Sequence, residues 1–569
     1  MDGSRELHKR LWDKIRFVVI LGVMASITGF VFTTWLDAPW GGDKINFFAA
    51  ARQADYHGSF PFNVYRSWEL KPLGHRAAIY GIYKAATTVS DYSNKPGFEK
   101  ASKGVYAAAV LLITAVVLFS ARRWLVRKNI PMLWVFFGFA LVFLSMDWHI
   151  ALQAEEMSIF FILISLPLAA AKSKPLNLLS GLPLAALFAL KGITILLALY
   201  VPIILYALGP EYRQQLRWCA LGLAAWFVLI MAVLASIFPQ ELRDLHNASL
   251  LQGSFNFQAR NLANVLWVFT NKFQQAPVFA PIVILAWISL PALAWNKDWT
   301  KIAAFLAMAA VGGTVVFLQA AWFGYHFAVL IVPAIWFLLV LRTGAWELAA
   351  RLNPSKLAFL VAWSLGLIGL LAVVVYIDRQ STVIVPAGTI GFNLAALSAG
   401  FTILLSWLAI RSKLGLNLDW HSLVLTCFVL VFAGAFWIRF QSPWSPTQND
   451  RSEAVQMAYD DYDERYRFSE QTEVLYFSEG AAYQYGAPSH CRYFNMEALK
   501  RLDKPGAQKI KTSLIFRESL ECALSYDGNY ILGDFDMSQL PELSAKINKE
   551  YLLVPPPDPE LNHPFYQKR

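Results

Sequence analysis

The chain has 569 residues, of which 57% are hydrophobic, 15% aromatic and only 15% charged. Soluble domains carry about 25% charged residues, so this composition excludes an ordinary soluble protein and predicts an integral membrane protein. The formal net charge of +10 does not indicate a nucleic-acid partner. The basic residues form short clusters between apolar runs, which is the pattern that sets membrane topology.

Apolar runs long enough to cross a bilayer recur along the chain and predict a mainly α-helical, polytopic transmembrane bundle. The first run follows a basic N-terminal stretch and predicts a signal anchor. The two runs on either side of Lys191 are short and predict either one long bent element or two half-helices. We expect about thirteen spans, at 17–36, 104–121, 130–147, 157–171, 176–190, 192–208, 218–238, 277–295, 301–321, 326–341, 356–377, 388–410 and 421–438.

The distribution of Lys and Arg among the turns predicts the orientation of the chain in an inner (plasma) membrane. If the N-terminus is cytoplasmic, the more basic turns all fall on the cytoplasmic side. Three long segments then lie outside, at 37–103, 239–276 and 439–569. Because long loops commonly carry function, we expect the polar chemistry on this outer face.

The composition becomes polar near residue 439, so residues 1–438 are assigned to the transmembrane domain and 439–569 to a soluble extracytoplasmic domain. Strands are expected at 473–478, 512–516 and 529–533, with helical patterns between and after them. This order predicts a small α/β domain.

Two cysteines, Cys491 and Cys522, lie in this C-terminal region, where an outer location would expose them to an oxidising compartment. We therefore predict a disulfide between them, the alternative being two free buried thiols. The Pro-rich run at 554–559 predicts an extended tail.

An ordered set of motifs starts in the first outer loop. Asp43 lies just past the first span, before a small-residue helical pattern that leads to Gly58 and Pro61-Phe-Asn-Val-Tyr65. Four further motifs follow in order: Gln153-Ala-Glu-Glu-Met-Ser158, Ala189-Leu-Lys191-Gly192, Gln252-Gly-Ser-Phe-Asn256-Phe-Gln258-Ala-Arg260, and Trp322-Phe-Gly-Tyr325-His326. Together they resemble glycosyltransferase family 87, the mannosyltransferase-like group among the polyprenol-phosphate-sugar-dependent enzymes of the membrane C superfamily.

The resemblance implies a helical membrane glycosyltransferase of the C type. It implies inverting transfer of mannose, or of another hexose or pentose, from a polyprenyl-phosphate sugar to an envelope glycan or glycolipid. It also implies that no metal and no other cofactor is required. The family's base is an aspartate in the first outer loop, which assigns that role to Asp43.

The chemistry of the residues supports the same roles. Sugar transfer from a lipid phosphate needs a base for the acceptor hydroxyl and cations for the leaving phosphate. Asp43 is the candidate base, although an Asp at this position could instead cap a helix starting near Ile45, and Asp37 and Asp55 are rivals. Lys191 interrupts an apolar stretch and suits a lipid phosphate, the alternative being a lysine that snorkels to the interface.

Further candidate substrate-binding residues lie in the expected outer segments: Arg52, Tyr65, Asn256, Arg260 and His326. The alternative for each arginine is a solvated surface charge, and for the histidine a satisfied interfacial residue. The adjacent Glu155 and Glu156 could be catalytic, but a helix N-terminus favours such anions in any case.

The sequence has no cluster with metal-ligand spacing, and no phosphate-binding Gly-rich loop that would suit a nucleotide-sugar donor. Two other functions stay open. Many spans and a lysine within the membrane also suit a transporter or flippase of lipid-linked sugars, although no internal repeat is evident. A non-catalytic scaffold of a polysaccharide pathway is the third possibility, because Gly192 stands where the family has a proline.

Overall fold

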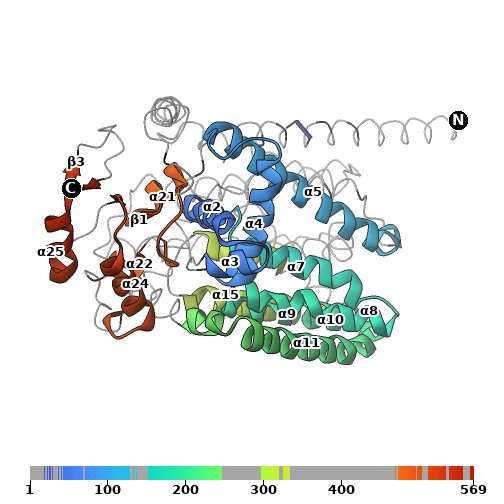
Figure 1. The fold of residues 1–569 in the computed structure, drawn as a ribbon. Helices are drawn as coiled ribbons and strands as arrows, with labels where there is room; N and C mark the ends of the chain where they lie inside the picture. The colour runs from blue at the N-terminus through green and yellow to red at the C-terminus, as the bar shows by residue number, and fades with distance from the viewer. Residues whose placement is uncertain are drawn as a thin grey trace, which may run out of the picture.

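The structure is a computed structural model (Figure 1). It describes residues 43–67, 71–127, 151–246, 297–319 and 324–333, most of 472–569 and isolated positions such as Trp40. The protein is mainly helical, with a small mixed sheet at the C-terminus. The predicted fold class, a helical membrane protein with a small C-terminal α/β domain, is confirmed.

The first predicted outer loop is a folded helical unit. It contains the helices α2 (Asp43–Ala54), η1 (Asp55–His57), α3 (Phe62–Arg66) and α4 (Leu73–Thr87). Helix α2 is almost entirely buried, because its run of small alanines lets neighbouring backbones approach closely. Gly58 ends η1 with a φ of 92°, a conformation that glycine adopts without steric cost.

Three described helices are long and apolar enough to cross a membrane. They are α5 (Lys95–Arg127), α11 (Pro210–Ile237) and α15 (Trp299–Gln319). Their large apolar side chains stay exposed, for example Leu112 and Val228, as expected of surfaces that face lipid. Helix α5 begins within the first loop, so it connects the loop unit directly to the bundle.

Shorter helices pack against these long ones. They are α7 (Ala154–Ala169), α8 (Lys174–Leu179), α9 (Gly181–Leu190), η2 (Gly192–Leu199), α10 (Tyr200–Leu208) and η3 (Gly324–Leu330). Lys191 separates α9 from η2 in an extended conformation, with φ −166° and ψ 116°. The chain therefore forms two short helical elements here, one of the two predicted arrangements. Helices α9 and α11 meet at Gly181 and Gly222, where a Cβ on Gly181 would lie 2.2 Å from the Gly222 carbonyl carbon.

The other predicted spans are described to different extents, and of the span at 326–341 the structure describes residues 326–333. Spans at 104–121, 157–171, 218–238 and 301–321 each coincide with a described helix. The spans at 130–147, 277–295, 356–377, 388–410 and 421–438, and most of 17–36, lie outside the described residues. The count of thirteen and the orientation of the chain stay predictions.

The C-terminal domain contains four strands in the order β1-β2-β4-β3. The pair β1–β2 is parallel and the other two pairs are antiparallel. The strands are β1 (Val474–Tyr476), β2 (Tyr530–Leu532), β3 (Tyr551–Val554) and β4 (Phe565–Lys568). The helices are α21 (Glu479–Tyr485), α22 (Glu497–Lys500), α24 (Leu514–Ser525), η4 (Met537–Gln539) and α25 (Pro541–Glu550).

One strand prediction is wrong. Residues 512–516 start helix α24, because the Ser513 side chain caps the helix by accepting a hydrogen bond from the Phe516 N–H. The predicted tail at 554–559 overlaps β3 at Val554, and its other residues lie outside the described part of the chain. Cys491 and Cys522 form a disulfide, as the sequence predicts.

The domain packs against the first loop (Figure 1). On β1, Val474 and Tyr476 belong to the hydrophobic core shared with α2 and the bundle, whereas Leu475 belongs to a second core with α24 and α25. This alternation follows the period of two of a β-strand. Gln53 at the end of α2 completes the contact, since its Nε2 donates to the Ala487 carbonyl at 2.7 Å.

Candidate active site

Asp43 begins helix α2 beside residues from two other segments. Its Oδ2 accepts a 2.9 Å hydrogen bond from Gln153 Nε2, and it lies 3.8 Å from Nζ of Lys71. The Lys71 side chain is 7% exposed, whereas that of Asp43 is 45% exposed. The carboxylate is therefore oriented by buried partners while one side of it stays accessible to a substrate.

The surrounding charges keep Asp43 ionised. Burial raises its pKa, but Lys71, the hydrogen bond from Gln153, and the more distant Lys44 and Lys191 together lower the pKa below the usual aspartate value. A carboxylate that is deprotonated at neutral pH can accept a proton from a hydroxyl group, as a general base must.

Lys191 lies in a second, more deeply buried polar group. Its Nζ donates to Oε1 of Glu155 at 2.7 Å and to Oε1 of Gln319 at 2.5 Å. Glu155 is fully buried, and His326 Nε2 lies 3.5 Å from the same Oε1 atom. In the described part of the chain, the other oxygen of Glu155, Oε2, is buried without a hydrogen-bond partner. The Glu155 carboxylate and the Lys191 ammonium group compensate each other's charge. Buried charged groups in proteins are usually paired in this way.

The two groups form one electrostatic cluster. Lys191 interacts with both Asp43 and Lys71, and His326 interacts with Lys191, Lys71 and Asp43. A close helix contact brings them together, since a Cβ added to Gly74 in α4 would lie 2.7 Å from the carbonyl oxygen of Ala189 in α9. Only glycine permits this approach, which places the start of α4, just after Lys71, beside the end of α9, just before Lys191.

Glu156, the neighbour of Glu155, stabilises the local structure before helix α7. It hydrogen-bonds to the Tyr106 hydroxyl, and its Oε2 accepts a 2.9 Å bond from the Leu152 N–H. The Leu152 carbonyl is hydrogen-bonded to Nε2 of His75 at 2.8 Å. Glu156 therefore fixes the turn before α7, which positions Gln153 and Glu155.

Two predicted substrate-binding residues lie elsewhere. Arg52 is nine residues along α2 from Asp43, about 14 Å at 1.5 Å per residue, where its Nε donates to the Gly486 carbonyl of the C-terminal domain. Tyr65 accepts a 3.1 Å hydrogen bond from the Gln240 N–H. Both hold segments of the chain together, and the structure brings neither to Asp43.

The rival Asp55 is bound by Tyr80 and Tyr83 at 2.9 and 2.7 Å and also pairs with Lys84. These contacts occupy both of its oxygens. Three other candidates, Asp37, Asn256 and Arg260, lie outside the described residues.

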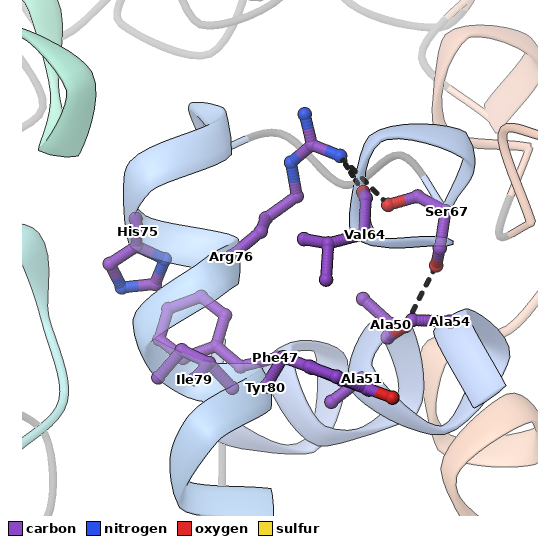
Figure 2. Close-up of a pocket in the computed structure, with 10 residues that line it drawn as sticks. All are labelled: Phe47, Ala50, Ala51, Ala54, Val64, Ser67, His75, Arg76, Ile79 and Tyr80. Atoms are coloured by element: carbon purple, nitrogen blue, oxygen red, sulfur yellow. Dashed lines mark hydrogen bonds between the residues drawn. The ribbon is translucent and has the colours of Figure 1, made fainter. Parts of the chain in front are cut away.

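A small pocket lies between α2, α3 and α4 (Figure 2). It is lined mainly by apolar side chains such as Phe47 and Ile79, together with His75 and Arg76. Burial lowers the pKa of His75 to about 3, so its imidazole is neutral. Neither Asp43 nor Lys191 lines this pocket. The pocket is therefore separate from the centre of the polar cluster.

Sequence reasoning missed Lys71 and Gln319, and it quoted Gln153 in a motif without giving it a role. Lys71 has no motif around it, and its only signal is a position in the first predicted outer loop. Within the described residues, no group of three or more His, Cys, Asp or Glu side chains is arranged to hold a metal ion.

Neither a protein-family model nor a curated protein sequence matches this chain, so the resemblance to family 87 stays a prediction. Two solved structures resemble the chain along its length. They are crystal structures of ArnT from Cupriavidus metallidurans, one bound to undecaprenyl phosphate and one in the apo state. Each aligns over 97% of both chains at 12% identity, with TM-scores of 0.46 and 0.48 respectively. Values this low do not identify site residues or substrates.

Proposed function

We propose that the protein is an integral membrane glycosyltransferase that uses a lipid-phosphate sugar as donor. The observation that carries the proposal is the pairing of an ionised carboxylate, Asp43, with Lys71 at 3.8 Å, with the more distant Lys191 acting electrostatically on the same carboxylate, at a helical bundle with apolar outer surfaces. A base next to cations is what transfer from a lipid phosphate requires. The apolar helices supply an environment for the lipid tail.

In the proposed reaction, Asp43 takes the proton of an acceptor hydroxyl. The resulting oxygen forms a bond to the anomeric carbon, while the bond from that carbon to the phosphate oxygen breaks. A single displacement of this kind inverts the anomeric centre. The electron pair of the broken bond leaves on the lipid phosphate, whose added charge Lys71 and Lys191 stabilise.

We propose that three buried side chains hold Lys191 in place for this reaction: Glu155, Gln319 and His326. Glu155 and Gln319 hold the Lys191 ammonium group at 2.7 and 2.5 Å, so it is pre-positioned before a donor binds. His326 lies against the same carboxylate and adds a ring nitrogen to the cluster.

The sequence resemblance supports the finer assignment. We propose a polyprenyl-phosphate donor, with mannose or another hexose or pentose as the sugar, and an envelope glycan or glycolipid as acceptor. Transfer would take place on the outer face of the plasma membrane. Both the distribution of basic turns and the Cys491–Cys522 disulfide favour an outer location for the C-terminal domain. Because two lysines supply the positive charge, we expect no metal requirement.

The test is a transfer assay with purified protein in nanodiscs. Donors would be a panel of polyprenyl-phosphate sugars, including mannose, with envelope lipid extract as acceptor and with and without chelator. We expect wild-type transfer to fall about 10²–10⁴-fold in Asp43→Asn, and about 10²-fold or more in Lys71→Met and Lys191→Met.

Asp91→Asn is the matched control, because Asp91 is a carboxylate of the same loop whose described partner is Ser93. It should retain wild-type transfer. Folded protein that binds the lipid phosphate but transfers no sugar from any donor would contradict the proposal. Sugar movement across the membrane without transfer would instead identify a transporter, and absence of both would leave the scaffold.

A further inference from the structure

The position of Lys71 depends on a buried arginine. Lys71 lies outside any helix, directly before α4, and its carbonyl accepts a 2.9 Å bond from Arg76 Nε. The Nη1 group of Arg76 also donates to the carbonyls of Val64 and Ser67, at 2.5 and 2.9 Å, as the dashed lines of Figure 2 show. One guanidinium group thus binds the carbonyls of Val64, Ser67 and Lys71 together.

Arg76 is itself held by a carboxylate from a distant segment. Its Nη2 lies 2.5 Å from Oε2 of Glu241, and the other oxygen of Glu241 accepts a 2.6 Å bond from the Leu73 N–H. Both side chains are almost completely buried, at 4% and 2% exposure. Glu241 therefore binds the start of α4 at two points, next to Lys71.

The same helical segment, residues 239–246, also contacts the C-terminal domain. Asp244, one turn after Glu241, accepts a 2.6 Å bond from Arg492 Nη2. The same Nη2 lies 3.4 Å from the Tyr65 carbonyl, within the loop that Arg76 organises. Arg492 directly follows Cys491, whose disulfide to Cys522 ties this part of the domain to α24.

We propose that Arg76 and Glu241 are positioning residues that hold Lys71 beside Asp43, and that the C-terminal domain braces them through the Arg492–Asp244 pair. This rests on the proposed function in one respect, namely that Asp43 and Lys71 act on the substrate. It gives the C-terminal domain a role in shaping the site, without any contact of its own to the reacting atoms.

Buried ion pairs contribute little to stability on average, because desolvation offsets their attraction. Two such pairs, Arg76–Glu241 and Arg492–Asp244, occur within one turn of residues 239–246 and fix the geometry of adjoining backbone. Both engage the loop before α4, where precise placement of one ammonium group affects transition-state stabilisation.

The test uses the effect of Lys71 on Asp43 as a gauge of position. The titratable groups around Asp43 are Lys44 in α2, Lys71, Lys191 and, across the cluster, His326. Of these, Lys71 lowers the pKa of Asp43 most. The acid limb of the kcat/KM profile reports the pKa of the free enzyme's base, so displacing Lys71 should move this limb to higher pH.

We expect the acid limb to move up by about one pH unit in Lys71→Met, since a nearby opposite charge lowers a carboxylate pKa by about 1–3 units. Glu241→Gln and Asp244→Asn should move it in the same direction by about half as much. Glu241→Gln should add nothing in the Lys71→Met background, because both changes act through the same ammonium group.

Glu518→Gln is the matched control. It removes the negative charge that the Tyr493 hydroxyl contacts at 2.7 Å within the C-terminal domain but leaves the Arg492–Asp244 pair in place. Its acid limb should stay at the wild-type pH. If Glu241→Gln is active and its acid limb does not move, the positioning role is refuted even though the proposed function stands.

A second measurement does not depend on activity. Amide hydrogen exchange of residues 61–73, followed by mass spectrometry in nanodiscs, should be at least about tenfold faster in Glu241→Gln and Asp244→Asn than in wild type and Glu518→Gln. Unchanged exchange would overturn the inference. If exchange is faster in these variants but the wild-type protein has no transferase activity, the positioning inference stands and the proposed function is wrong.

Discussion

The ammonium group of Lys191 donates a 2.7 Å hydrogen bond to Glu155, a residue 36 positions earlier in the chain. The glutamate is fully buried and the lysine side chain is 11% exposed. Removing one member of such a pair leaves an uncompensated charge in a dry environment, whereas replacing both by apolar residues of similar size removes the need for compensation.

Glu155→Gln should therefore destabilise the protein by about 3–5 kcal/mol, and the double change Glu155→Leu with Lys191→Met should recover much of that loss. Sugar transfer should be lost in the double variant, because the ammonium group is gone. Thermal unfolding in detergent and the transfer assay would measure the two effects separately. A double variant that is stable and still active would show that Lys191 has no role in transfer.

The contact of Gly74 with Ala189 allows a second test of the site geometry. Gly74→Ala places a Cβ 2.7 Å from a backbone oxygen, so α4 must move away from α9. We expect a loss of about 1–3 kcal/mol of stability and at least about a tenfold loss of transfer, because Lys71 and Lys191 are separated.

Gly81→Ala is the matched control, since it lies in the same helix and a Cβ there meets nothing within 4 Å. It should leave transfer unchanged and stabilise the helix by up to about 1 kcal/mol. Equal losses in the two variants would mean that helix α4 tolerates alanine poorly everywhere, and that the contact with α9 is not special.

Much of the fold follows from local patterns in the sequence. Apolar length predicts α5, α11 and α15, and short apolar runs predict β1 and β2, whose residues are almost all buried. The error at 512–516 has a physical origin. A short apolar run fits a strand or a helix equally well, and only the Ser513 cap and the burial of Ile515, Phe516, Ser519 and Ala523 at helical spacing decide for α24.

The site could be predicted only in part. Asp43 and Lys191 stand out because one follows a span and the other interrupts apolar sequence. Lys71 does not, because its role depends on an arrangement set by Arg76 and by Glu241, 165 residues further along the chain. Strand β3 was also missed, since two of its residues, Leu552 and Leu553, are exposed at the sheet edge and break the expected alternation.

The disulfide gives a prediction about the C-terminal domain. Cys491 and Cys522 close a loop of 31 residues, for which loop entropy implies a stabilisation of about 3–4 kcal/mol. The double variant Cys491→Ser with Cys522→Ser should lower the unfolding temperature, and reductant should have no further effect on it. Cys219→Ser is the control, because Cys219 is a buried free thiol in α11. If reductant leaves wild type unchanged while the double variant is destabilised, the loss reflects packing and the bond is not formed.

The buried imidazole of His75 predicts how stability depends on pH. Burial holds its pKa at about 3, whereas the imidazole of the unfolded chain has a pKa near its ordinary value of 6.5. Between these values the unfolded chain binds a proton that the folded chain does not, so this residue makes stability fall as pH is lowered from 6.5 toward 3. The slope is about 1.4 kcal/mol per pH unit for one proton.

His75→Gln should therefore be less stable than wild type at pH 7 but lose less stability on acidification, as measured by thermal unfolding in detergent between pH 7 and 5. Phe47→Leu is the control, because it weakens the packing against the His75 ring, 4.7 Å away between centroids, and leaves the imidazole in place. Its stability should be lower than wild type by a constant amount across the pH range. Parallel profiles for His75→Gln and wild type would show that His75 binds its proton equally well in the folded and the unfolded chain, which would contradict a buried neutral imidazole.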